Sequence, residues 1–271
     1  MSVATELTKL NTNIKNAYDE IATKGGTVPQ NKNTDNLATA ISSISGGGGS
    51  DWSEIGYTEE PDFIQTGIDY GKQIQNNWDS SVTYRKNAFL QDYQLMFFPE
   101  VDTSKITNAR GMFQTSSIIC LGDFDFSNIT DAREMFMNCK NLFEVGDLNF
   151  EKSCPLGSMF YNCTSLRKVK SINITSNSNS TNIFSYCSSL QTVEKINTNL
   201  TNFSNAGIFY GCSKLDDDTL KEILKFLKKL TEQTSSNKKL SYFGLSTELA
   251  QKCTTFNEWT ELANDGWTTG Y

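Results

Sequence analysis

Four cysteines recur in nearly the same phrase, and sulfur at a regular spacing could bind a metal or act as a nucleophile. The phrases MFMNCKNL, MFYNCTSL, IFSYCSSL and IFYGCSKL place Cys139, Cys163, Cys187 and Cys212 24 or 25 residues apart. Zinc sites favour close ligand pairs such as CxxC, and the sequence has none. A phrase repeated at a fixed interval is typical of stacked structural units. We therefore interpret these thiols as buried small apolar residues, with a ladder of metal ligands as the alternative.

Other catalytic chemistry finds little support in the residue types. The chain has no histidine, so the commonest general base and transition-metal ligand is missing. Zinc-protease, serine-hydrolase, P-loop and dinucleotide-binding motifs do not occur. Two acidic groups, Asp123/Asp125 and Asp216/Asp217/Asp218, could serve a polysaccharide depolymerase, but they fall at a repeat turn and a helix start, where acids have structural roles. We expect no catalytic residue, no cofactor and no metal.

The net charge and the hydropathy of the chain argue against two classes of partner, nucleic acids and membranes. A net charge of −7 and a pI near 4.8 argue against binding to nucleic acid. No apolar run approaches the roughly 18 residues that a membrane span requires, so we expect no membrane insertion. The first twenty residues are polar and amphipathic, unlike a secretory signal, so we expect synthesis in the cytosol with all seven cysteines reduced.

A repeat of 23 to 25 residues supplies the elements that position the cysteines. Six phenylalanines mark it, and a small or polar residue follows each by three positions, with an aliphatic residue at six. The interval predicts coils with a short helical piece at Met-Phe and a short parallel strand after the leucine. The predicted repeat core consists of Phe89, Phe113, Phe136, Phe160, Phe184 and Phe209 together with Cys139, Cys163, Cys187 and Cys212.

Segments on both sides of the repeats complete the predicted organisation. Residues 1–44 form a helical hairpin whose apolar stripe, Leu7, Leu10, Ile14, Ala17 and Ile21, follows the heptad pattern of docking or oligomerising helices. Residues 45–50 are a glycine-rich linker. Residues 51–81 are an N-terminal cap, 82–215 the repeats, and 216–271 a C-terminal cap with an amphipathic helix. The fold class is thus an α/β repeat solenoid with a small N-terminal helical module and helical caps.

Three of these segments resemble known families. VDTSKITNARGMF and FDFSNITDAREMFMNCKNL resemble the unit of BspA-like leucine-rich repeats, although Ser116 replaces the cysteine in one coil and SINITSNSNSTN departs from the pattern. The first 44 residues are similar to a module that opens tail and appendage proteins of phages infecting low-GC Gram-positive bacteria. The C-terminal GLSTELAQKC and WTELANDGWTTGY resemble the ends of repeat proteins from the same phages.

These resemblances imply a phage virion protein, assembled in the host cytoplasm. We expect a fibre or appendage that docks on other virion proteins through residues 1–44, forms a homo-oligomer such as a trimer, and binds a host-surface glycan or protein through its repeats. Tyr161, Tyr186 and Tyr210 are candidate receptor contacts, although packing along the helical ridge is the interpretation that we favour for them. The alternatives are a head fibre or decoration protein without a receptor role and a bacterial adhesin-like repeat protein.

Overall fold

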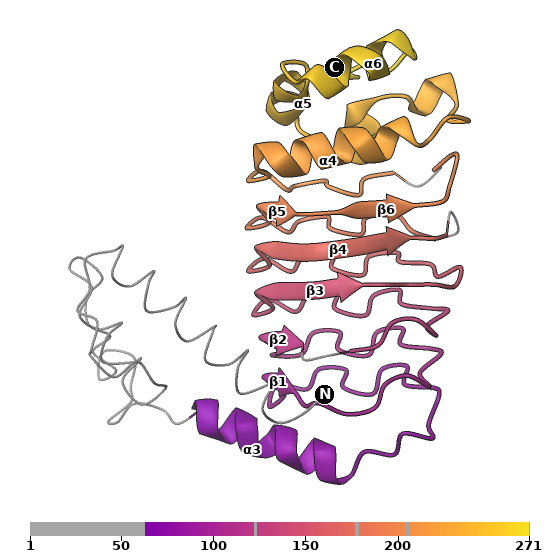
Figure 1. Ribbon diagram of the computed structural model, residues 1–271. Helices are drawn as coiled ribbons and strands as arrows, with labels where there is room; N and C mark the ends of the chain where they lie inside the picture. Colours follow the sequence, from indigo (N-terminus) through magenta and orange to yellow (C-terminus); the bar gives the residue numbers. More distant parts are fainter. Residues whose placement is uncertain (1–62, 122–123, 177–178, 204–205, 271) are drawn as a thin grey trace, which may run out of the picture. The chain divides into compact units, whose positions relative to one another are not determined.

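A parallel β-sheet runs through the described part of the chain (Figure 1). This computed structural model describes residues 63–121, 124–176, 179–203 and 206–270. Its strands are β1 (Phe97–Phe98), β2 (Cys120–Leu121), β3 (Glu144–Leu148), β4 (Lys168–Ile174), β5 (Thr192–Val193) and β6 (Ile196–Thr198). The docking residues Leu7, Leu10, Ile14, Ala17 and Ile21 and the linker at 45–50 lie outside the described residues.

All strand pairs are parallel, and their order follows the sequence from β1 to β5, with β6 also paired to β4. The register keeps equivalent residues side by side: Val145 pairs with Val169 and Val169 with Val193. Each strand therefore lies next to the strand one repeat interval away. The apolar members of these columns are buried, and their side chains find apolar contacts mainly in the neighbouring coils.

The Met-Phe segments are turns, so the prediction of a short helical piece there is wrong. Around Phe160, the residues two before and two after, Ser158 and Asn162, have φ angles of 55° and 60°, and the same two positions are left-handed in all six coils. The Phe160 N–H donates to the carbonyl of Ile183 in the next coil (2.8 Å), whereas Tyr161 bonds within its own turn to Ser158. Because alternate N–H groups point to the next coil, the backbone cannot follow a right-handed helix.

One coil is a residue shorter, and this changes which isoleucine is buried. The interval from Phe113 to Phe136 is 23 residues, and the sequence spacing predicts Ile119 as its aliphatic core residue. The structure instead buries Ile118 completely and leaves Ile119 half-buried. The missing residue lies between Phe113 and Ile118, because the Ile119 N–H already bonds to Met96 O, seven residues after Phe89.

The C-terminal end of the sheet is closed by helix α4 (Asp217–Lys228), which Figure 1 shows lying along β5 and β6. Asp216 caps the helix by accepting the Thr219 N–H at 2.8 Å. Two side chains of α4 satisfy edge N–H groups: Thr219 Oγ1 accepts from Val193 (2.9 Å) and Glu222 from Ile196 (3.1 Å). The last strands therefore present no open edge where α4 covers them.

Beyond α4, the chain returns to the stack. The short 3₁₀ helices are η2 (Ser235–Asn237) and η3 (Leu240–Phe243), and α5 (Thr247–Cys253) and α6 (Asn257–Asn264) follow. In η3, the carbonyls of Tyr242 and Phe243 accept the N–H groups of Gly207 and Phe209 (2.9 Å each), so this segment continues the column of turns. The helical elements η3 and α5 therefore both precede α6 in this cap.

At the other end, α3 (Phe63–Asn76) packs beside β1 and the first coil. The Tyr70 hydroxyl donates to Asp92 at 2.8 Å, and Trp78 Nε1 donates to the carbonyl of Asp102 at 2.9 Å. Asp92 occupies the position that cysteine has in later coils, so the departure from the repeat coincides with a contact to α3. Residues Phe63–Tyr271 form one compact unit. No helix in the described part of the chain has the length and apolarity of a membrane span.

Candidate binding surface

The predicted core phenylalanines form one column of stacked rings. Successive ring centroids from Phe113 to Phe184 lie 5.2 or 5.3 Å apart with interplanar angles of 4–10°. Phe209 continues the column at 5.7 Å from Phe184, and Phe89 begins it at 5.6 Å from Phe113. Phe89 is only half-buried, unlike the others, because it lies at the end of the stack next to α3.

The four repeat thiols lie in a second buried column beside the rings. Each sulfur lies 2.9–3.0 Å from the carbonyl oxygen of the phenylalanine in the preceding coil, for example Cys163 Sγ from Phe136 O. Burial raises the pKa of Cys139 to about 11 and the pKa values of Cys163 and Cys212 well above the ordinary value. A thiol with a raised pKa is a poor nucleophile and a poor metal ligand. Among the described residues, no cluster of three or more His, Cys, Asp or Glu side chains is arranged to hold a metal.

The carboxylates considered for hydrolysis have structural partners. Asp125 accepts the Ser127 N–H at 2.8 Å, whereas Asp123 lies outside the described residues. Asp216 caps α4, and Asp217 pairs with Lys252 at 2.5 Å. Asp218 pairs with Lys221 at 3.3 Å. The described carboxylates therefore serve a turn, a helix cap and two surface ion pairs.

The three candidate tyrosines form an exposed ladder, which we call the tyrosine ridge. Tyr161 and Tyr186 meet edge to face at 5.3 Å, as do Tyr186 and Tyr210. Tyr161 is half-buried, whereas Tyr186 is 43 % and Tyr210 55 % exposed. Aromatic rings packed on each other and open to solvent are rigid contact groups with little side-chain entropy to lose on binding.

Tyr186 holds its place on the ridge at a conformational cost. Its φ is 64°, in the left-handed region that bulky residues rarely adopt, where the preceding coil has Asn162 and the following coil Gly211. A Cβ at Gly211 would lie 3.1 Å from Tyr186 Cδ1, so this glycine leaves room for the ring. Because this position is left-handed in every coil, the backbone does not distinguish Tyr186; the packed and exposed rings make the ridge the strongest candidate surface in the described part of the chain.

Another exposed aromatic residue, Phe143, lies immediately before β3. Phe143 is 40 % exposed, and the Arg167 guanidinium of the next coil lies 5.0 Å from its ring centroid. Nearby on β3 and β4, Lys170 and Ser171 both donate to Asp147 at 2.7 Å, and these bonds hold the pKa of that carboxyl below its ordinary value. Sequence reasoning missed Phe143, although its position immediately after the repeat leucine is a signal that could have shown it.

Comparisons with known proteins extend over the repeats. A profile of the family described as "Mycoplasma protein of unknown function, DUF285" matches residues 80–203, somewhat less than half of the chain. Searches of curated proteins and of solved structures found no match. The chain is therefore similar to this family from the first coil to the segment that precedes Phe209.

Proposed function

We propose that this chain is a non-enzymatic structural protein of a bacteriophage virion, a fibre or appendage with an α/β solenoid of BspA-like repeats. It docks by residues 1–44 and presents the repeats to the host surface. The resemblance of its N-terminal and C-terminal segments to phage proteins motivates the assignment. The buried thiols and the structural partners of the carboxylates support a binding role over an enzymatic one.

The tyrosine ridge is the observation that carries the receptor-binding part of the proposal. Its rings are exposed at Tyr186 and Tyr210 and pack edge to face on one another. A stack of coils offers a long rigid surface without a deep pocket, and weak contacts from many copies on one particle add up to firm attachment. We propose that a host-surface glycan or protein binds along Tyr161, Tyr186 and Tyr210.

Particle composition and assembly test the structural role. Purified virions should contain the polypeptide by mass spectrometry, and deletion of residues 1–44 should remove it from particles while the repeats stay folded by circular dichroism. Absence of the full-length polypeptide from virions would rule out the proposal. Incorporation of the shortened chain would rule out docking through this segment.

A bacterial adhesin-like repeat protein is the second candidate, since the matching family is described as a mycoplasma protein. Immunogold labelling separates the two locations: label on the cell surface without particles favours the adhesin, and label on particles favours the virion protein. Where on the particle the label lies then decides between a tail appendage and a head fibre or decoration protein.

A further inference from the structure

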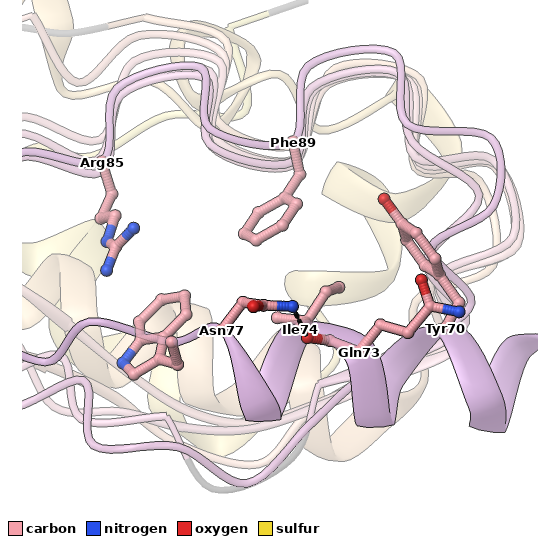
Figure 2. Close-up of a pocket in the computed structure, with 7 residues that line it drawn as sticks. Tyr70, Gln73, Ile74, Asn77, Arg85 and Phe89 are labelled. Atoms are coloured by element: carbon pink, nitrogen blue, oxygen red, sulfur yellow. Dashed lines mark hydrogen bonds between the residues drawn. The ribbon is translucent and has the colours of Figure 1, made fainter.

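A cavity of about 290 Å³ lies between α3 and the first coil. Figure 2 shows Gln73, Ile74 and Asn77 below it on the helix, with Arg85 and Phe89 above. Ligand pockets for drug-sized molecules begin near roughly 300 Å³. The cavity is widely open to solvent, so one compact group can lie in it while the rest of a longer chain extends outside.

Arg85 supplies a cation with unused hydrogen-bonding capacity. Its guanidinium carbon lies 4.0 Å from the Trp78 ring centroid, and its Nη2 donates to the carbonyl of Asp79 at 2.5 Å. Its Nε is buried and has no hydrogen-bond partner among the described residues. Burial also lowers the pKa of Arg85, against the opposing effect of Asp79. Because Nε is shielded, an incoming acceptor would meet Nη1, which makes no hydrogen bond within the described residues.

The remaining walls combine aromatic surface with amides. Trp78 and Phe89 contribute rings, and the Tyr70 hydroxyl is engaged by Asp92, which leaves its ring as the lining surface. Asn77 donates through Nδ2 to the Gln73 carbonyl at 2.8 Å, and no bond from the Gln73 side chain holds it within the described residues. Aromatic faces suit the C–H side of a sugar ring, amides suit its hydroxyls, and a guanidinium suits a carboxylate.

We propose that this cavity binds one acidic sugar residue of the uronic-acid type within a host-surface polysaccharide. The inference rests on the proposed function for its biological setting and adds a site distinct from the tyrosine ridge. The guanidinium of Arg85, stacked on Trp78, takes the carboxylate, the Phe89 ring contacts the apolar face of the sugar, and the Gln73 amide bonds a hydroxyl.

Binding of glucuronate to the full-length chain tests the site, measured by saturation-transfer NMR with glucose as the matched neutral probe and with inorganic phosphate, which has no C–H proton to observe, added as a competitor. We expect saturable glucuronate binding, at least tenfold weaker binding of glucose, and no comparable binding of phosphate. No saturable glucuronate binding, equal binding of glucose, or equal binding of phosphate would each overturn the inference.

Variants locate the binding. Arg85→Gln should weaken glucuronate binding at least tenfold, and Arg85→Lys should also weaken it, because lysine lacks the planar donor fork that stacks on Trp78. Gln73→Ala, at an exposed helix position, keeps the test decisive if the arginine variants fold poorly, and a severalfold loss is expected. Gln251→Ala, the same change at an exposed position of α5, is the control and should bind as the parent does. Unchanged binding by Arg85→Gln, or by Gln73→Ala, contradicts the site.

The two proposals can fail separately. Virions that lack the polypeptide would end the virion assignment while glucuronate binding by the purified chain remained. Virions that contain it, with no glucuronate binding by the purified chain, would end only the sugar site.

Discussion

Replacing Tyr186 by alanine and by glycine should reverse the usual order of stability of these two residues. In regular structure, glycine is about 0.5–1 kcal/mol less stable than alanine because it loses more backbone entropy on folding. At Tyr186 φ is 64°, a conformation that costs a residue with a Cβ about 1–2 kcal/mol and costs glycine almost nothing. Both variants lose the same two ring contacts, so their difference isolates the backbone.

The net expectation is that Tyr186→Gly is more stable than Tyr186→Ala by about 0.5–1 kcal/mol. Urea unfolding of the full-length chain, followed by circular dichroism with equal m values for both variants, measures this difference. Asn162→Ala and Asn162→Gly repeat the comparison at the equivalent position of the preceding coil, where φ is 60°. If alanine is as stable as glycine at both sites, the left-handed backbone does not carry the cost assigned to it.

Three further predictions follow from the stack and its surface. Phe160→Ala, which removes a ring between neighbours at 5.2 and 5.3 Å, should lower the free energy of unfolding by about 4 kcal/mol. Phe89→Ala should lower it by about half as much, because Phe89 is half-buried at the end of the column. Equal losses in urea unfolding would contradict this difference. The pKa of Cys139 is about 11 in the folded chain, above the ordinary 9.0, so the unfolded chain loses this proton first. Stability should therefore fall by ~1.4 kcal/mol per pH unit from pH 9 to 11, and Cys139→Ala should remove that part of the slope; an unchanged slope contradicts the assignment. Tyr210→Ala should reduce adsorption of particles to host cells at least severalfold, whereas Tyr84→Ala, 61 % exposed and off the ridge, should not, and equal effects would argue against the ridge.

The repeat spacing predicted the buried phenylalanine column because each coil buries its apolar residues against its neighbours. The phenylalanines that recur every 23 to 25 residues are those whose rings stack in the structure. The acids before an amphipathic run predicted the start of a helix, and in the structure Asp216 caps α4. Such features depend on spacing along the chain and on local capping, both of which can be read directly.

The conformation of the Met-Phe segment could not be read in this way. Its residues favour a helix locally, but the N–H groups of residues such as Phe160 bond to the next coil, and this requires left-handed residues on both sides. The burial of Ile118 in place of Ile119 likewise depends on where the shorter coil loses its residue. Tertiary hydrogen bonds overrode local propensity in both cases.

The sequence predicted some features of the two candidate sites, and the tertiary structure decided the others. By itself the sequence determined the repeat, its apolar columns and the tyrosines, because period and residue type are local properties. Only the tertiary structure decided that Tyr186 and Tyr210 face solvent, that Tyr70 bonds to Asp92, and that Arg85 stacks on Trp78 beside a cavity. Those contacts depend on how α3 and successive coils pack. They join residues that the repeat spacing does not relate to one another.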